Sequence, residues 1–160
     1  MKTVYIGLGS NLGDRRENLK RAMESLAKDD LNVMRESSIY ETEPRDIVDQ
    51  PWFLNQVVEA ETELMPRQLL ARLEKIERGM GRKLGIAKGP RLIDLDILLY
   101  GDAVVSTADL EIPHPRMTER RFVLEPLAEI APGLRHPRTR KTVREMLDEV
   151  SGQVVRRVES

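Results

Sequence analysis

The sequence contains no cysteine among its 160 residues. A disulfide framework, a thiolate metal site and a cysteine nucleophile are therefore excluded. The chain also lacks any apolar run near the roughly 20 residues that a membrane-spanning helix needs, and no long apolar segment follows its first methionine. These absences favour a soluble protein in a reducing compartment, and we expect a cytoplasmic location.

Net charge and aromatic side chains are scarce as well. The 26 basic and 27 acidic residues nearly cancel, so a global nucleic-acid signature is absent and only local charge arrangements can matter. The aromatic residues are one Trp, three Tyr and two Phe. The core must therefore be aliphatic, and any surface that stacks on a flat ring must come from very few residues. A chain of this length is expected to form one domain.

Hydrophobic periodicity predicts a regular order of strands and helices. We expect strands over residues 3–8, 31–40, 52–62 and 93–99, and helices over residues 14–28 and 66–80. The resulting β-α-β-β-α-β order predicts a ferredoxin-like α+β fold with an antiparallel sheet and helices on one face. A C-terminal extension follows, with a hairpin strand, two helical pieces and a final strand expected over residues 103–105, 121–130, 143–150 and 153–158.

Residues 89–101, with the sequence GPRLIDLDILLYG, combine a turn, an arginine and two carboxylates on a strand. Asp94 and Asp96 share one face of this strand, roughly 7 Å apart at their Cα atoms. The opposite, apolar face is expected to carry Ile93, Leu95, Ile97 and Leu99. Carboxylates at this separation suit Mg²⁺ held together with substrate phosphates. The alternative is a solvated strand face, but the solid apolar side and the nearby Arg91 favour the metal.

Two basic clusters lie on either side of this strand in the sequence. The first is in a loop with several glycines and consists of Arg82, Lys83, Lys88 and Arg91. The second consists of Arg116, Arg120 and Arg121. Arginine suits phosphate because its planar fork donates two hydrogen bonds and stays charged. The clusters can clamp a triphosphate, with the glycine-containing loop as a lid, although each residue taken singly is equally explained as surface charge.

Four further residues are candidate ligand contacts. Because aromatics are scarce, Phe53 and Phe122 are the leading candidates for sandwiching a flat heterocycle, and Asn55 lies on the same strand face as Phe53. His114, held between two prolines, is either a packing histidine or a donor to a phosphate oxygen. The glycines at residues 7, 9 and 13 match neither a dinucleotide fingerprint nor a Walker A loop, which favours a structural turn beside the site.

Three motifs together resemble the 6-hydroxymethyl-7,8-dihydropterin pyrophosphokinase family of folate biosynthesis. They are YIGLGSNLG at residues 5–13, GPRLIDLDILLYG at 89–101, and IPHPRM at 112–117 followed by RRFVLEPL at 120–127. The resemblance implies one pyrophosphokinase domain over residues 1–160. It implies transfer of the β,γ-pyrophosphoryl group of ATP to the pterin hydroxymethyl oxygen, release of AMP, and two Mg²⁺ ions. We expect a monomer whose partners are these two small substrates, with no nucleic acid and no membrane.

The resemblance also assigns roles position by position. Asp94 and Asp96 resemble the Mg²⁺ ligands, and Arg82 and Arg91 resemble catalytic residues that face the phosphates. The pterin pocket implied by the family consists of Thr42, Pro44, Phe53, Asn55 and Phe122. The implied ATP site consists of Glu77, Arg82, Arg91, Ile97, His114 and Arg120. Asp96 is our candidate for a general base.

The sequence departs from the family pattern mainly in the basic loop. Lys88 stands where the family usually has tryptophan, and Lys83 is the nearest substitute for a second lid arginine near Leu84. Asp109 and Glu111 occupy positions on the phosphate side. These differences bear on lid closure and ATP affinity rather than on the reaction.

Two other classes of function remain to be compared. A nucleotidyltransferase also uses Gly-Ser and Asp-x-Asp, but close together, whereas here they are 84 residues apart. An RNA-binding module with the same order of strands and helices needs exposed aromatic residues and a basic sheet face, whereas this chain has two aspartates on one of its predicted strands.

Overall fold

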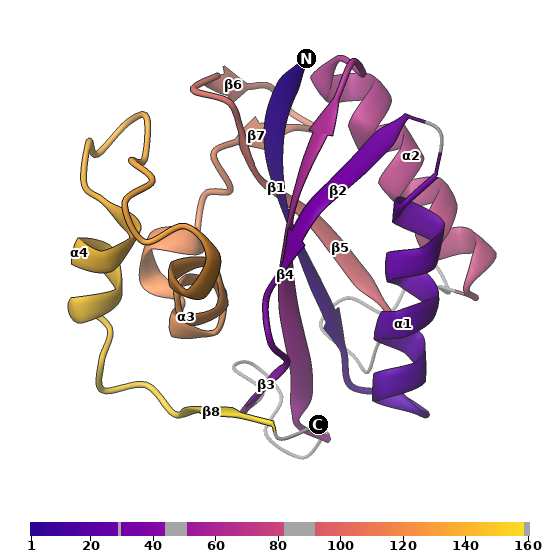
Figure 1. The fold of residues 1–160 in the computed structure, drawn as a ribbon, viewed down its shortest axis with the longest axis horizontal. Helices are drawn as coiled ribbons and strands as arrows, with labels where there is room; N and C mark the ends of the chain where they lie inside the picture. The colour runs from indigo at the N-terminus through magenta and orange to yellow at the C-terminus, as the bar shows by residue number, and fades with distance from the viewer. Residues whose placement is uncertain (29, 44–50, 82–91, 159–160) are drawn as a thin grey trace.

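The computed structural model describes residues 1–28, 30–43, 51–81 and 92–158. The first part of the chain forms β1 (Lys2–Ser10), α1 (Arg15–Leu26), β2 (Leu31–Glu36), β3 (Tyr40–Thr42), β4 (Phe53–Thr62), α2 (Pro66–Gly79) and β5 (Asp94–Tyr100). The C-terminal extension adds β6 (Val105–Ser106), β7 (Glu111–Ile112), the 3-10 helix η1 (Met117–Glu119), α3 (Arg121–Ile130), α4 (Val143–Asp148) and β8 (Val155–Arg157) (Figure 1). No α-helix in these described ranges is both long and apolar enough to cross a membrane.

The main sheet is antiparallel, with strand order β5-β1-β4-β3-β8 and with β2 also paired to β4. This order confirms the predicted α+β fold. The strand predicted over residues 31–40 is two strands instead, which pair with different parts of β4. The break is at Ser37, whose backbone N–H donates to Val57 O and whose hydroxyl accepts from Val57 N.

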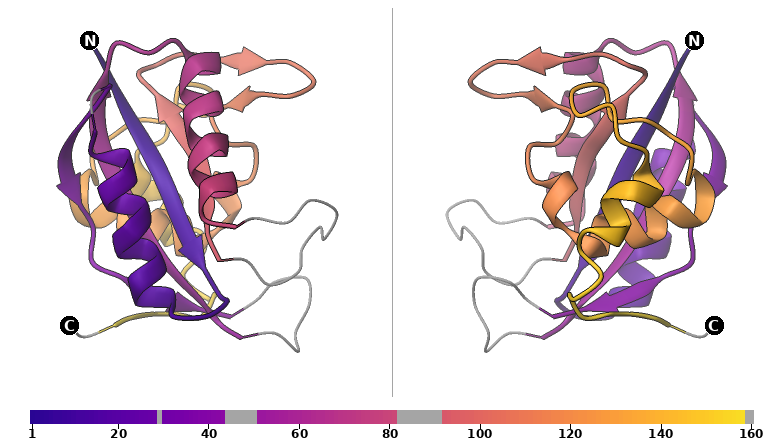
Figure 2. Two further views of the ribbon diagram at one scale, coloured as in Figure 1. Left: turned by 90° about the vertical axis from the view of Figure 1, so that its right-hand side faces the viewer. Right: turned by 90° about the vertical axis from the view of Figure 1, so that its left-hand side faces the viewer.

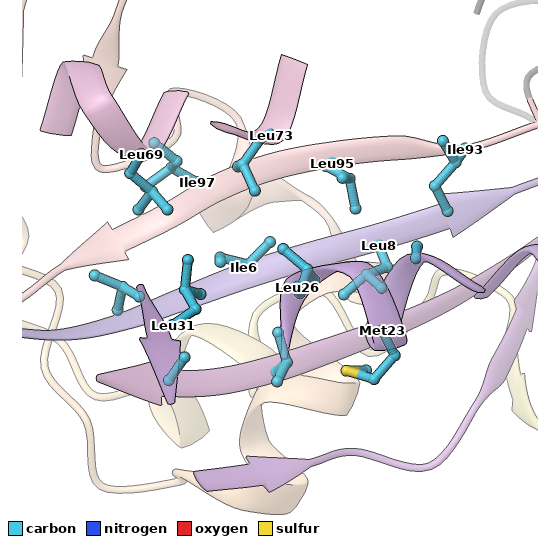
Figure 3. Close-up of a cluster of buried hydrophobic side chains, with 14 of the residues drawn as sticks. Ile6, Leu8, Met23, Leu26, Leu31, Leu69, Leu73, Ile93, Leu95 and Ile97 are labelled. Carbon is cyan, nitrogen blue, oxygen red and sulfur yellow. The ribbon is translucent and has the colours of Figure 1, made fainter. Parts of the chain in front are cut away.

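Alternate residues of the central strands supply two hydrophobic cores. Ile6 and Leu8 of β1 pack on one face with Leu26 of α1 and Leu69 of α2 (Figure 3). On the opposite face, Tyr5 packs with side chains of α3 and α4. Figure 1 shows α1 and α2 on one side of the sheet, as predicted, and α3 and α4 of the extension on the other.

A β-bulge in β5 changes which of its side chains face each core. Tyr5 pairs with Leu99 and Ile6 pairs with Ile97, so Leu98 is the extra residue on β5. Leu98 and Leu99 both contribute to the core under α3 and α4. The prediction that Leu99 shares a face with Ile97 is therefore wrong, because a bulge breaks the two-residue repeat. Asp94 and Asp96 precede the bulge and keep the predicted shared face.

Local sequence signals account for the ends of the first two helices. Asp14 is the N-cap of α1 and accepts a hydrogen bond of 3.1 Å from the Glu17 backbone N–H. Pro66 is the first residue of α2, where a missing N–H costs nothing. The first residue of each helix is therefore set by a local signal, and both helices turn their apolar side chains toward the sheet.

Candidate active site

Three neighbouring strands place predicted metal and pterin residues on one face of the sheet. Asp94 on β5 pairs with Gly9 on β1, and Gly9 pairs with Asn55 on β4. Asp96 pairs with Gly7, two residues along. Directly opposed residues of antiparallel strands project to the same side, so Asp94, Asp96 and Asn55 share the face that carries α3. Two strand spacings, roughly 10 Å, separate the aspartate strand from the asparagine strand.

Gly7 and Gly9 lie within β1, because this strand runs to Ser10 and the expected turn begins later. A Cβ on Gly9 would lie 3.0 Å from Asn55 Oδ1 and 3.5 Å from Phe53 Cδ1, whereas a Cβ on Gly7 would meet Leu98 at ordinary contact distances of 3.5 Å or more. A Cβ at residue 9 would therefore crowd the Asn55 amide, which would have to shift to admit it. The signal in the sequence was the spacing of two residues, which puts both glycines on one strand face.

Thr42, Phe53 and Asn55 lie together where β3 meets β4. Asn55 Nδ2 donates a 2.7 Å hydrogen bond to Thr42 Oγ1, and Thr42 is the cross-strand partner of Phe53. Thr42 is buried, and Phe53 and Asn55 are half-buried. The structure thus brings these three predicted pterin residues into one patch, with the asparagine amide oriented by the threonine hydroxyl.

Phe122 and Arg120 lie at the start of α3. The Arg120 guanidinium carbon is 5.3 Å from the centre of the Phe122 ring, within the range of a cation–π contact. A cavity of about 300 Å³ borders both Phe122 and Thr42. Its other described lining residues are Glu43, Gly152, Gln153, Val154 and Val155. Phe53 and Asn55 are not among these described lining residues. Thr42 therefore borders the cavity on one side and contacts Phe53 and Asn55 on the other.

A second cavity, of about 320 Å³, lies beside Asp96 on β5. It contacts three residues that the family resemblance assigned to the metal and to ATP, namely Asp96, Ile97 and His114. The rest of its described lining is Leu70, Leu95, Thr107, Ala108, Asp109, Leu110, Glu111 and Pro115. The lining combines apolar side chains with the carboxylates of Asp96, Asp109 and Glu111, and its apolar wall suits a nucleoside whose phosphates point toward Asp96.

The segment between β6 and β7 supplies much of this second cavity, which the sequence analysis did not predict. Figure 2 shows the β6–β7 hairpin beside the start of α2. Arg67, in the first turn of α2, donates from Nη1 to both carboxylate oxygens of Asp109, at 2.9 and 2.7 Å, and from Nη2 to Thr107. These bonds tie the β6–β7 hairpin to α2. Asp109 is therefore paired with an arginine of its own chain, and both side chains are largely exposed.

Glu77 contributes to the site through the backbone of β5. This glutamate is only 6% exposed, and its Oε2 accepts a 2.8 Å hydrogen bond from the Leu95 backbone N–H. β5 is the end strand of the described sheet, so its outward N–H groups need partners from elsewhere. Glu77 thus fixes β5 at the residue between Asp94 and Asp96, a contact that the sequence did not reveal.

His114 is held as a neutral imidazole. Burial, together with the nearby Arg120 and Arg116 guanidinium groups, lowers its pKa to about 4. Its Nδ1 accepts a 3.2 Å hydrogen bond from the Arg116 backbone N–H, which leaves the proton on Nε2. This environment therefore favours a neutral His114 that can donate from Nε2.

This lowered pKa predicts a pH-dependent contribution of His114 to stability. The unfolded chain takes up the proton near pH 6.5 but the folded chain only near pH 4, so the contribution is complete above pH 6.5 and falls as the pH drops toward 4. We expect the difference in unfolding free energy between the wild type and His114→Asn to shrink by about 2 kcal/mol from pH 7.5 to pH 5. Urea unfolding at both pH values measures it, and a difference that does not change with pH would contradict the assignment.

The described residues provide two carboxylates for a metal. No group of three or more His, Asp or Glu side chains that could hold an ion occurs among them. Asp94 is half-buried and Asp96 is exposed, on one strand face. Such a pair fits Mg²⁺, which keeps water and substrate phosphates as its remaining ligands. Pro44, Arg82 and Arg91 lie outside the described residues, as do Lys83, Leu84 and Lys88, and their roles stay predictions.

Comparison with known proteins supports the resemblance seen in the sequence. The family model for 7,8-dihydro-6-hydroxymethylpterin-pyrophosphokinase (HPPK) matches residues 5–132. The 2-amino-4-hydroxy-6-hydroxymethyldihydropteridine pyrophosphokinase of Aquifex aeolicus is 44% identical over 149 residues, which cover 93% of this chain and 92% of that protein. Its namesake in Bacillus subtilis is 49% identical over 128 residues, covering 79% and 77% respectively.

Other relatives are much longer than this chain. The folic acid synthesis protein fol1 of Schizosaccharomyces pombe is 45% identical over 156 residues, which are 97% of this chain but 21% of that protein. A crystal structure of Plasmodium falciparum HPPK-DHPS with pteroate shares the fold, with a TM-score of 0.75 and 17% identity over 92% of this chain and 42% of the other. The extent of the family match and the identity to full-length relatives show that this chain belongs to the 7,8-dihydro-6-hydroxymethylpterin-pyrophosphokinase (HPPK) family.

Proposed function

We propose that this chain transfers pyrophosphate from ATP to the hydroxymethyl group of 6-hydroxymethyl-7,8-dihydropterin, giving AMP and the pterin diphosphate. Beyond family membership, one observation carries the proposal. Asp94 and Asp96 share a sheet face with Asn55, and the β1 residues that pair with them on this face, Gly7 and Gly9, are both glycines. This arrangement gives two substrates adjoining places on one surface.

The two ends of this face suit different substrates. The cavity beside Ile97 and His114 suits the nucleoside, and the neutral His114 would donate its Nε2–H to an oxygen of the nucleotide. Asn55 and Thr42 would bind the donor and acceptor edge of the pterin, and Phe53 and Phe122 would stack on its faces. Together these residues would direct the hydroxymethyl oxygen toward the β-phosphorus of ATP, and positioning of this kind accounts for much of the rate of phosphoryl transfer.

Asp94 and Asp96 would hold the two Mg²⁺ ions of the proposed reaction. Bound there with ATP, the ions would neutralise charge on the phosphate oxygens. The exposed carboxylate of Asp96 is our candidate to accept the hydroxyl proton. Arg82 and Arg91 are proposed to face the phosphates on the AMP side, with Arg120 reaching them from α3. In this proposal the protein acts as a cytoplasmic monomer.

Incubation with ATP, Mg²⁺ and 6-hydroxymethyl-7,8-dihydropterin tests the function directly. Phosphorus NMR should show AMP and a pterin diphosphate in equal amounts, and omission of Mg²⁺ should abolish both. Free pyrophosphate together with a nucleotidylated pterin would instead identify a nucleotidyltransferase and contradict the proposal. Salt-dependent RNA binding without any AMP release would instead favour an RNA-binding module.

Replacing Gly9 by alanine should weaken pterin binding. The new Cβ would displace Asn55, whose Oδ1 is 3.0 Å from it, and disturb the bond to Thr42. Loss of one well-placed hydrogen bond corresponds to a rise of about tenfold in KM for the dihydropterin, with KM for ATP nearly unchanged. Gly7→Ala is the matched control because its Cβ meets Leu98 at ordinary distance. Equal effects of the two substitutions would show that Asn55 is not the reason for glycine at residue 9.

A further inference from the structure

The C-terminal segment of the chain reaches back to the proposed pterin site. β8 pairs with β3, so that Val155 lies opposite Thr42 (Figure 1). Residues 152–155 also line the cavity of about 300 Å³ that borders Thr42 and Phe122. This segment lies beyond the residues that match the family model, 5–132. One wall of the cavity is therefore made by residues that the family match does not cover.

Gln153 joins this segment to the backbone just before Phe122. Its Oε1 accepts a 2.9 Å hydrogen bond from the Arg121 backbone N–H, and its Nε2 donates a 2.7 Å bond to the Glu119 carbonyl oxygen. Its own carbonyl oxygen accepts a further 2.8 Å bond from the Arg121 guanidinium. One side chain thus holds the chain on both sides of Arg120, at the point where η1 ends and α3 begins.

The backbone held in this way carries two side chains of the proposed site. Arg120 lies between Glu119 and Arg121, and Phe122 follows directly in the first turn of α3. The N–H of Arg121 is among the first N–H groups of α3, which have no partner within the helix. Without its bonds to the Gln153 side chain, this turn would be held less firmly, by the helix bonds to the Arg120 carbonyl and by the Arg121 guanidinium, and the Phe122 ring and the Arg120 guanidinium stacked on it would shift with the turn.

We propose that Gln153 is a positioning residue for the pterin site, which acts by fixing the turn that presents Phe122 and Arg120. This inference rests on the proposed function. We call the two bonds from the Gln153 side chain to Arg121 N–H and to the Glu119 carbonyl oxygen the clamp. Glutamine suits the position because its amide supplies the one acceptor and the one donor that these bonds need. A glutamate could still accept from Arg121 N–H but would place an acceptor against the Glu119 carbonyl oxygen. A methionine has similar length and would lose both bonds.

Kinetics of Gln153→Met and Gln153→Glu test this role. We expect Gln153→Met to raise KM for the dihydropterin about tenfold, the equivalent of one or two lost hydrogen bonds, with a smaller change in kcat. Gln153→Glu should also raise KM for the dihydropterin, because it keeps the bond from Arg121 N–H but sets a carboxylate oxygen against the Glu119 carbonyl oxygen. The flexible arginine stem can restore the Arg120 contact, so KM for ATP should change less than KM for the dihydropterin.

Thr142→Ala is the matched control for a loss of stability elsewhere in the extension. Thr142 caps α4 by accepting a 3.1 Å bond from Glu145 N–H, and its loss costs about 1 kcal/mol. It should leave KM for the dihydropterin unchanged. Equal KM values in the wild type and Gln153→Met, or an equal rise in Thr142→Ala, would overturn the inference.

Amide hydrogen exchange at Arg121 separates the clamp from the catalytic activity. Exchange should quicken at Arg121 in Gln153→Met and stay slow in Thr142→Ala, and unchanged exchange in Gln153→Met would overturn the clamp itself. Absence of turnover in the wild type would count against the proposed function, whereas wild-type turnover with unshifted KM in the Gln153 variants would count against this inference alone.

Discussion

Asp94→Asn and Asp96→Asn should each lower Mg²⁺-dependent AMP release by about 10³-fold or more, because each substitution removes a carboxylate ligand from the ions that neutralise the phosphates. The two side chains share one strand face before the β5 bulge, with Gly9 and Gly7 as their cross-strand partners. Neither is buried in the core, so asparagine of the same shape should leave the fold intact. Steady-state assay of AMP formation at saturating ATP and dihydropterin measures the effect.

Asp102→Asn is the control for this pair. Asp102 is exposed and lies in the turn directly after β5, so its substitution removes a carboxylate at the other end of the same strand without touching the shared face. It should keep near-normal turnover. Circular dichroism and urea unfolding should show all three variants folded. Near-normal turnover in both Asp94→Asn and Asp96→Asn would show that the ions bind elsewhere.

Metal binding can be measured separately from turnover. Titration of Mn²⁺ in the presence of a non-hydrolysable ATP analogue should give weaker binding in Asp94→Asn and Asp96→Asn than in Asp102→Asn. Unchanged Mn²⁺ affinity combined with lost turnover would instead point to a role in proton transfer, which the exposed Asp96 can take.

The sequence predicted the fold well wherever the signal was local. Hydrophobic periodicity was enough to place α1, and strand alternation was enough to put Asp94 and Asp96 on one face. Features that depend on the neighbouring strand could not be predicted in this way. The bulge at Leu98 and the break at Ser37 arise from pairing with β1 and β4, and no periodicity in a single segment encodes the register of its partner.

The same distinction applies to the candidate site. Scarcity of aromatics singled out Phe53 and Phe122, and the structure places Phe53 opposite Thr42 on the sheet and Phe122 at a cavity that Thr42 also borders. The contacts that fix the site connect residues far apart in the chain, such as Arg67 with Asp109 and Gln153 with Arg121. From the sequence alone, a polar residue at such a position cannot be told from an ordinary surface residue, because its partner lies far away in the chain. The lowered pKa of His114 likewise depends on burial that only the folded chain provides.

Glu77→Ala should reduce kcat by about 10²-fold while leaving KM for ATP nearly unchanged. The substitution removes the acceptor of the Leu95 N–H at 2.8 Å, so β5 loses its anchor between Asp94 and Asp96, and a loss of alignment of this kind costs about 10²-fold in rate. Within the described residues, Glu77 lines neither cavity, which is why binding of ATP should be spared. The unpaired N–H and the space left in the interior should also lower the free energy of unfolding by about 2–3 kcal/mol.

Glu77→Gln separates the hydrogen bond from the charge. The glutamine amide oxygen can accept from Leu95 N–H in the same place, so this variant should recover most of the rate and stability that Glu77→Ala loses. Kinetics with each substrate varied in turn, together with urea unfolding, distinguish the two roles open to Glu77. A rise in KM for ATP with kcat preserved would show that Glu77 contacts the nucleotide, as the family resemblance implies. A fall in kcat that glutamine restores would show that it acts by holding the aspartate strand in register.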